Sequence, residues 1–295
     1  MMDQAQNLRK MISTKNNEVK HKEESVNNNN VLVYTITSGK GGVGKSNFTV
    51  NLAVEMQRRG RKVLIIDGDY GMANVNVLFG IVPKKTLHDV IYKGVPLREV
   101  VIESESGVKI ISGGSGFFEM TEVSEERQNA LIEGMLQLKD IDIILIDTSA
   151  GVSRNLLSFI SFSQEMILVT TPEPTSLTDA YSLIKMVAKM SIKDSIKVVI
   201  NKTRDQRNAD AIFNRLEKAA LSFLGIHLNK LGYVVEDSKV KDSVMEQTPF
   251  IELHPNCTAS KNISSIVDKL LGQKYSNAEK TTMQQVVSRM MRVFR

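Results

Sequence analysis

The sequence lacks the features that define several common protein classes. Among its 295 residues there is no tryptophan, 5% are aromatic, and a single residue, Cys257, is cysteine. One cysteine excludes a disulfide framework and a cysteine cluster within the chain, which fits a reducing compartment. His254 precedes Cys257 closely, but no second pair follows at the spacing of metal ligands, so we assign no structural metal there.

Long apolar segments and a strong net charge are also absent. No run approaches the roughly 18 uninterrupted apolar residues that cross a bilayer, and the N-terminus has no apolar signal core. The 38 Lys and Arg residues against 33 Asp and Glu residues give a net charge of only +5. A nearly neutral protein lacks the broad positive field of a dedicated nucleic-acid-binding protein. We therefore expect a cytoplasmic protein with no nucleic acid among its partners.

Apolar runs rich in β-branched residues alternate with amphipathic stretches from residue 31 onward. The runs predict strands at 31–37, 63–67, 108–112, 141–147, 166–171, 196–201 and 231–235. The amphipathic stretches predict helices at 45–59, 124–138, 176–190, 208–224, 239–247 and 260–271. Strands that are apolar on both faces and alternate with helices predict an α/β fold, with a mostly parallel, doubly wound sheet covered by helices on both faces. Its ligand should lie at the carboxyl ends of the strands.

Three parts are expected along the chain. Residues 1–30 form a short N-terminal segment followed by a linker; residues 10–30 mix Lys, Glu, Ser and Asn with hardly any apolar periodicity, which predicts disorder. Residues 31–272 form the α/β domain. Residues 273–295 form a polar linker followed by an amphipathic helix.

The segment Gly39-Lys40-Gly41-Gly42-Val43-Gly44-Lys45-Ser46 matches the phosphate loop G-x-x-x-x-G-K-[ST], with a predicted strand before it and a predicted helix after it. Glycines allow backbone N–H groups to curl around phosphate oxygens, and the helix offers its positive end. We expect Lys45 to neutralise the β- and γ-phosphates of ATP, and the Ser46 hydroxyl to bind Mg²⁺. The alternative is a chance glycine-rich turn. The expected nucleotide-binding residues here are Gly39, Lys40, Gly41, Gly42, Val43, Gly44, Lys45, Ser46 and Asn47.

The second lysine, Lys40, is unusual for a phosphate loop. With it, the text G-K-G-G-V-G-K-S resembles the deviant Walker A motif of the MinD/ParA class of P-loop ATPases. The resemblance implies that Lys40 reaches the partner's nucleotide across a dimer interface, so that ATP joins two copies into a homodimer. The alternative is a solvated loop lysine.

Two carboxylates follow predicted strands at the same edge. Asp69 closes the text Asp67-Gly68-Asp69, and Asp147 follows the apolar run 141–146. Carboxylates near a γ-phosphate can orient the attacking water or hold metal-bound water. The resemblance implies that Asp69 positions the attacking water and that Asp147 lies on the metal side of the nucleotide. Many members of the class have proline where this chain has Ser149, which leaves the geometry of the switch loop open. Strand-end aspartates also form turns and caps. The candidate catalytic residues are Lys40, Lys45, Asp69 and Asp147, and the candidate metal ligands are Ser46, Asp69 and Asp147.

Asn201 follows the predicted strand 196–201 and resembles the adenine-reading asparagine of the same class. An amide side chain offers both a donor and an acceptor to the base edge. Guanine-specific proteins usually carry N-K-x-D, and here Arg204 occupies the fourth position. Glu236 is expected to complete the base pocket. A purely structural Asn201 is the alternative.

The last fifteen residues predict a cationic amphipathic helix, which is typical of an interfacial membrane helix. Such a short helix binds weakly alone and by avidity in a dimer. We expect it to hold the protein peripherally on the anionic inner face of the cell membrane. The alternative is a helix docked on the domain; both can hold in turn, docked without ATP and released with it. Its apolar face comprises Met283, Val286, Val287, Met290, Met291 and Phe294.

The N-terminal text D-Q-A-Q-N-L-R, together with D-T-S-A-G-V-S at Asp147 to Ser153, resembles the FlhG/FleN (YlxH) family of flagellar number regulators. The resemblance implies an activator segment that docks on the flagellar SRP-type GTPase FlhF, with Gln4 as the active residue, and contact with flagellar C-ring proteins. A tail without a role is the alternative. The expected partner-binding residues are Asp3, Gln4, Ala5, Leu8 and Arg9.

These features predict a slow, Mg·ATP-dependent switch ATPase that dimerises with ATP and regulates flagellar number or placement. One alternative is a cell-division MinD-type positioning ATPase, and another is a ParA-type DNA segregation ATPase. A metabolic ligase would need a second substrate pocket. An iron–sulfur reductase would need bridging cysteines, which Cys257 alone does not supply.

Overall fold

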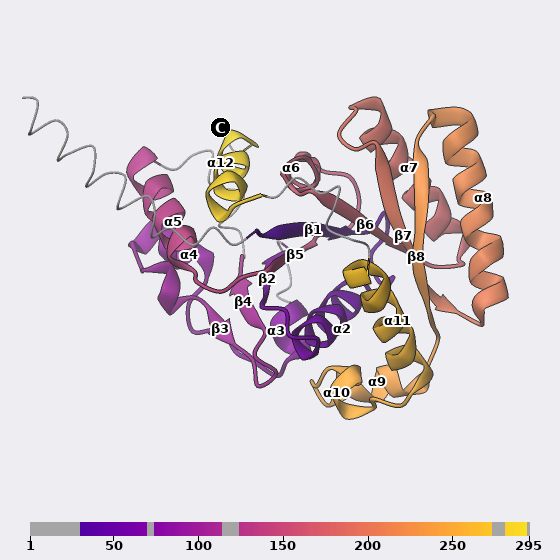
Figure 1. Ribbon diagram of the computed structural model, residues 1–295, viewed down its shortest axis with the longest axis horizontal. Helices are drawn as coiled ribbons and strands as arrows, with labels where there is room; N and C mark the ends of the chain where they lie inside the picture. Colours follow the sequence, from indigo (N-terminus) through magenta and orange to yellow (C-terminus); the bar gives the residue numbers. More distant parts are fainter. Residues whose placement is uncertain (1–29, 70–73, 114–123, 273–280, 294–295) are drawn as a thin grey trace, which may run out of the picture.

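An eight-stranded sheet forms the centre of the computed structural model, which describes residues 30–69, 74–113, 124–272 and 281–293 (Figure 1). The strand order is β3-β4-β2-β5-β1-β6-β7-β8, and every neighbouring pair is parallel except β3 and β4. The predicted mostly parallel sheet is thereby confirmed. The strands are β1 (Leu32–Thr37), β2 (Val63–Gly68), β3 (Ile102–Glu103), β4 (Lys109–Ser112), β5 (Ile143–Thr148), β6 (Glu165–Thr170), β7 (Ser195–Thr203) and β8 (His227–Val235).

Helices cover both faces of this sheet (Figure 1). One face packs against α2 (Lys45–Arg58), α10 (Phe250–Leu253) and α11 (Thr258–Gly272), with α3 (Asn74–Leu78) and α9 (Ser238–Met245) beside them. The other face packs against α4 (Leu87–Lys93), α5 (Glu125–Gln137), α6 (Arg154–Phe162), α7 (Pro174–Lys189), α8 (Gln206–Leu224) and α12 (Met283–Val293), and a 3-10 turn, η1, spans Leu97–Glu99.

The central strand β5 shows why the strands read as continuous apolar runs. Ile143 and Leu145 pack toward α2, whereas Ile144 and Ile146 pack toward the helices of the opposite face. Successive side chains of a strand point to opposite faces, so a sheet covered on both sides needs apolar residues at every position.

The short helices α3, α4, α6 and α10 were not predicted. They contain five, seven, nine and four residues, too few turns for an apolar periodicity to stand out from the surrounding loops. α6 nevertheless has a clear start, because the Ser153 side chain accepts a hydrogen bond from the backbone N–H of Leu156.

The carboxyl ends of the central strands gather the expected functional segments at one edge. In the register of β2 and β5, Asp67 lies opposite Asp147, and the segment after β1 leads into α2. The strand order therefore places the phosphate loop and both strand-end carboxylates together, as the sequence predicted for a parallel sheet.

The predicted C-terminal helix is present as α12 and is docked on the sheet, between α5 and α6 (Figure 1). The Val31 backbone N–H donates to the Thr281 carbonyl oxygen at 2.8 Å, which ties the entry of α12 to the start of β1. The structure thus shows the docked alternative, and membrane contact stays a prediction that requires release. The buried side chains of its expected membrane face are Met283, Val286, Val287 and Met290.

Other expected residues cannot be placed. Met291 belongs to α12, but its side chain lies outside the described part, as does Phe294. The expected partner-binding residues Asp3, Gln4, Ala5, Leu8 and Arg9 also lie outside the described residues. Among the residues that the structure describes, no helix is long and apolar enough to cross a membrane.

Candidate nucleotide site

The phosphate loop joins β1 to α2, and three of its glycines cannot be replaced without strain or collision. Gly42 has φ at +77°. Gly44 is the N-cap of α2 with φ at +88°, a backbone conformation that residues with a Cβ rarely adopt. A Cβ on Gly39 would lie 2.3 Å from the backbone carbonyl carbon of Asp179 in α7. The loop is therefore shaped partly by its own backbone and partly by close contact with α7.

The N-terminus of α2 is suited to an anion. The first turn of the helix contains no acidic residue, and its N-cap, Gly44, has no side chain to satisfy the free N–H groups. Free N–H groups and the helix dipole together attract phosphate oxygens. The helix start therefore has the features that the predicted phosphate site requires.

Lys45 and Asp147 form a buried ion pair at this site. Lys45 Nζ lies 2.9 Å from Asp147 Oδ1, and the two side chains are 7% and 0% exposed. Thr49 Oγ1 donates to the same oxygen at 2.9 Å. The lysine charge is therefore balanced by the carboxylate that the sequence assigned to the metal side.

The second carboxylate oxygen of Asp147 fits a metal or a metal-bound water. Asp147 Oδ2 is buried and has no hydrogen-bond partner among the described residues. The Ser46 hydroxyl lies 3.5 Å from the same Lys45 Nζ that contacts Asp147, so two of the three expected metal ligands, Ser46 and Asp147, lie near that nitrogen. No cluster of three or more His, Cys, Asp or Glu residues occurs in the described ranges. A cation held here would therefore complete its shell with water and phosphate oxygens, as Mg²⁺ commonly does.

Asp67 is a functional candidate to which the sequence analysis gave no role. Its side chain is buried, and burial, followed by the charge of Asp147, raises its pKa to about 7, against the backbone hydrogen bonds and the charge of Lys45 that lower it. Asp67 Oδ1 accepts from the Asp69 N–H at 3.1 Å, which fixes the turn that carries Asp69. The sequence could have indicated Asp67, because it is a carboxylate inside the otherwise apolar strand β2.

Asp69 lies one residue beyond β2 at the same edge, and residues 70–73 after it lie outside the described part. The loop after β5 is close too, because the Gly151 N–H donates to the Ser38 carbonyl oxygen at 3.0 Å. That hydrogen bond links the segment after Asp147 to the first residues of the phosphate loop.

Lys40 contacts the start of α7 within its own chain. Its Nζ lies 3.1 Å from Oε2 of Glu173, the N-cap of α7, and 2.8 Å from Oγ1 of Thr175, in the first turn of that helix. Lys40 and Glu173 are 37% and 61% exposed, so the pair is weak and easily exchanged. Nothing in the sequence indicated Glu173 or Thr175. The expected contact of Lys40 with a partner's nucleotide across a dimer interface stays a prediction.

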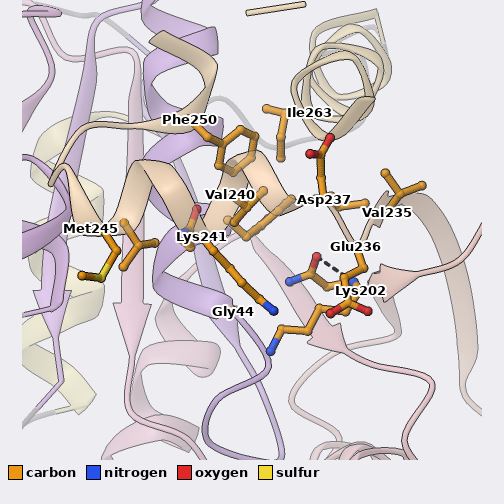
Figure 2. A pocket seen from close by; sticks show the side chains of 15 residues that line it. Gly44, Lys202, Val235, Glu236, Asp237, Val240, Lys241, Met245, Phe250 and Ile263 are labelled. Atoms are coloured by element: carbon orange, nitrogen blue, oxygen red, sulfur yellow. Dashed lines mark hydrogen bonds between the residues drawn. The ribbon is translucent and has the colours of Figure 1, made fainter. Parts of the chain in front are cut away.

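A cavity of about 600 Å³ opens beside the phosphate loop. Four of the predicted nucleotide-binding residues, Gly44, Asn47, Asn201 and Glu236, line it. Figure 2 shows Lys202 and Lys241 extending toward one another beside Gly44. An apolar cavity with polar groups at its mouth suits a flat heteroaromatic base. Its apolar walls are formed by Phe48, Val234, Val235, Val240, Val244, Met245, Phe250 and Ile263.

Asn201 is engaged with the loop and retains capacity for a ligand. Its Nδ2 donates to the Val43 carbonyl oxygen at 2.7 Å, and its Oδ1 accepts from the Lys202 N–H at 2.9 Å. A primary amide has two N–H donors and two acceptor lone pairs, so one of each remains. The structural alternative and the base-reading role are therefore compatible.

The fold and the phosphate site correspond to a known class. The family model described as NUBPL iron-transfer P-loop NTPase (ParA) matches residues 29–271. MinD from Pyrococcus furiosus is 28% identical in sequence, with a TM-score of 0.65 over 82% of this chain and 98% of that chain. MinD from Pyrococcus horikoshii, solved with Mg-ADP, is also 28% identical, with a TM-score of 0.65 over 84% and 98% of the two chains. The chain belongs to the ParA family of P-loop NTPases.

Within that family the relatives narrow the assignment. Antiactivator FleN from Pseudomonas aeruginosa is 36% identical over 241 residues, which cover 81% of this chain and 86% of FleN. The flagellum site-determining protein YlxH from Helicobacter pylori is 32% identical over 280 residues, which cover 94% and 93% of the two chains. The chain is a member of the FlhG/FleN (YlxH) group, which confirms the resemblance seen in its motifs.

Proposed function

We propose that this protein is an ATP-hydrolysing switch that forms a homodimer with ATP and regulates the number or placement of flagella. The observation that carries the proposal is the buried Lys45–Asp147 pair with its unpartnered oxygen at the start of α2. The relatives named FleN and YlxH, an antiactivator and a flagellum site-determining protein, supply the flagellar context.

Nucleotide binding rearranges the pair. Lys45 leaves Asp147 Oδ1 and neutralises the β- and γ-phosphates, while the N–H groups at the start of α2 donate to phosphate oxygens. Asp147 and Ser46 would then hold Mg²⁺, which supplies positive charge to the same phosphates. The base enters the cavity beside Asn201, whose remaining donor and acceptor select adenine.

In this proposal, Asp69 has the water-positioning role in ATP hydrolysis. Its carboxylate orients a water whose oxygen attacks the γ-phosphorus; the bond from that phosphorus to the β–γ bridging oxygen breaks, giving ADP and phosphate. Asp67 holds the turn beneath Asp69 through its contact with the Asp69 N–H. We expect this hydrolysis to be slow, as suits a switch.

Dimerisation requires Lys40 to exchange its contacts. In the isolated chain it pairs with Glu173 and Thr175, both at the edge that carries the nucleotide. An exposed ion pair contributes about 0 to 1 kcal/mol, so the phosphates of a partner's nucleotide compete with it readily. The monomer contact is therefore compatible with a bridging lysine.

Membrane association requires α12 to leave the sheet. Burying a Val or Met side chain contributes about 1.5 to 3 kcal/mol, so a helix with four such residues does not detach into water. It can exchange one apolar surface for another, and a bilayer offers that surface. Two released helices in one dimer would bind by avidity. On this proposal, ATP-driven dimerisation is the trigger.

The partner proposal rests on the family. We propose that residues 1–10 stimulate the flagellar SRP-type GTPase FlhF through Gln4, and that C-ring proteins contact the domain. Deleting residues 1–10 should abolish GTPase stimulation and leave ATP binding intact. Equal stimulation by the full and shortened chains would contradict the proposal.

The switch is tested with Asp69→Ala. Without its water-positioning carboxylate the variant should hydrolyse ATP far more slowly than wild type and accumulate as an ATP-bound dimer in light scattering. Co-sedimentation with anionic vesicles should then require ATP, and it should vanish in a chain ending at residue 272. A variant that hydrolyses ATP normally and stays monomeric would contradict the switch.

A further inference from the structure

Two consecutive side chains near the end of β7 both donate hydrogen bonds to the phosphate loop. Asn201 Nδ2 donates to the carbonyl oxygen of Val43 at 2.7 Å, and Lys202 Nζ donates to the carbonyl oxygen of Gly42 at 2.8 Å. The residues are 158 and 160 positions from their partners in the sequence, so the contacts tie the second half of the sheet to the loop. Figure 2 shows Lys202 beside Gly44 at the mouth of the cavity.

A regular strand cannot present two neighbouring side chains to one target, because successive side chains point to opposite faces. Here the strand is broken locally. Lys202 has φ at +53°, in the left-handed region that non-glycine residues rarely adopt, and the pairing of β7 with β8 is irregular between Ile200 and Thr203. The break turns Lys202 to the same side as Asn201. A strained backbone of this kind persists where surrounding contacts hold it, and it is common at functional sites.

The two contacts fix two successive peptide planes of the loop. In a trans peptide, the carbonyl of one residue and the N–H of the next point in opposite directions. Holding the carbonyls of Gly42 and Val43 toward β7 therefore turns the N–H groups of Val43 and Gly44 away from β7. These N–H groups belong to the motif that curls around phosphates, so their direction decides how well an anion is bound.

We propose that Lys202 is a positioning residue for nucleotide binding, which presets the direction of the Val43 and Gly44 N–H groups through its bond to the Gly42 carbonyl. The inference rests on the proposed nucleotide site. It assigns Lys202 no contact with the reacting atoms. Lys202 therefore affects ADP and ATP alike and leaves the hydrolytic step unchanged.

Three substitutions separate the side-chain bond from the backbone strain. Lys202→Ala removes the bond and keeps the strained conformation. Lys202→Gly removes both, because glycine adopts positive φ freely. Lys202→Arg keeps a cationic donor. The matched control is Lys239→Ala, since Lys239 is also a half-exposed lysine near this edge but pairs with Asp242 at 3.2 Å.

The first test measures binding of fluorescent ADP and ATP analogues, with Mg²⁺, by stopped flow. Lys202→Ala should weaken both nucleotides by about tenfold, mainly through faster release, because a charge-assisted hydrogen bond to the loop is lost. Lys202→Arg should recover affinity to within about twofold of wild type. At saturating ATP, kcat should stay within about twofold while KM rises.

Lys202→Gly should melt at a higher temperature than Lys202→Ala and yet bind nucleotide no better, which a role in stability alone would not produce. Hydrogen exchange of nucleotide-free protein gives an independent readout: peptides that contain Val43 and Gly44 should exchange faster in Lys202→Ala than in wild type or Lys239→Ala.

An ADP affinity of Lys202→Ala equal to that of wild type would overturn the inference. A loss of affinity confined to ATP would also overturn it, because that loss is expected of a lysine that contacts the γ-phosphate directly. If wild type and Lys239→Ala themselves bind no adenine nucleotide, the proposed function fails instead. The two failures are therefore distinguishable.

Discussion

The buried pair of Lys45 and Asp147 makes the sharpest prediction for the nucleotide-free protein. Lys45→Met keeps most of the aliphatic side chain and removes the charge. Asp147 is fully buried and, among the residues that the structure describes, would keep only the Thr49 hydroxyl as a donor. Removing one partner of a buried ion pair destabilises a protein by about 3 to 5 kcal/mol. We expect the lower end, about 3 kcal/mol, because the Thr49 hydrogen bond remains.

The assay is urea unfolding in nucleotide-free buffer with a chelator, for Lys45→Met, Asp147→Asn and the double variant. The double variant buries no unpaired charge, so it should be more stable than Lys45→Met by about 2 kcal/mol. Lys85→Met is the control, because it breaks the exposed Lys85–Glu99 pair and should change stability by less than about 1 kcal/mol. The reasoning is refuted if Lys45→Met unfolds like the control, or if the double variant shows the sum of the single losses.

Other contacts predict smaller or more specific effects. The pKa of Asp67 is raised in the folded protein, so its protonated carboxyl stabilises the fold at low pH, and this contribution is lost as pH rises toward 7. The free energy of unfolding should therefore fall by about 2 kcal/mol between pH 5 and 7. In urea titrations, Asp67→Asn should make the free energy of unfolding depend less on pH. Glu173→Gln should remove the ionic partner of Lys40 and leave its hydrogen bond to Thr175, so the ATP-bound dimer should form at equal or lower protein concentration in light scattering. Weaker dimerisation would argue that Glu173 acts in the dimer itself. Val287→Asp should lower the free energy of unfolding by about 3 kcal/mol and abolish vesicle binding, because a carboxylate opposes burial both on the sheet and in the bilayer. A variant with the stability of wild type would show that α12 is not docked in solution.

The sheet and the phosphate loop were predictable because their signals are local. Alternating apolar runs and helices fix a parallel sheet, and the glycine motif lies within eight consecutive residues between a strand and a helix. Asp147 could be singled out for the same reason, since it is the carboxylate at the end of the otherwise apolar run of β5. Parallel strands then bring these segments to one edge without further information.

The residues that sequence reasoning missed depend on contacts over long distances along the chain. Lys40 and Glu173 are 133 residues apart, and neither residue signals the other in the sequence. The contact of Lys202 with the loop depends on a left-handed residue inside a strand, which a pattern of apolar residues does not reveal. The docking of α12 was left open, because an amphipathic helix does not specify whether its apolar surface meets a sheet or a bilayer.

The central claim is that Mg·ATP joins two copies of this chain. The most direct measurement is the mass of the full chain by light scattering, with a saturating non-hydrolysable ATP analogue and Mg²⁺, and again with ADP. The account predicts twice the 32.9 kDa chain mass with the analogue and a single chain with ADP. A single chain under both conditions, or a dimer that forms equally well without nucleotide, would contradict it.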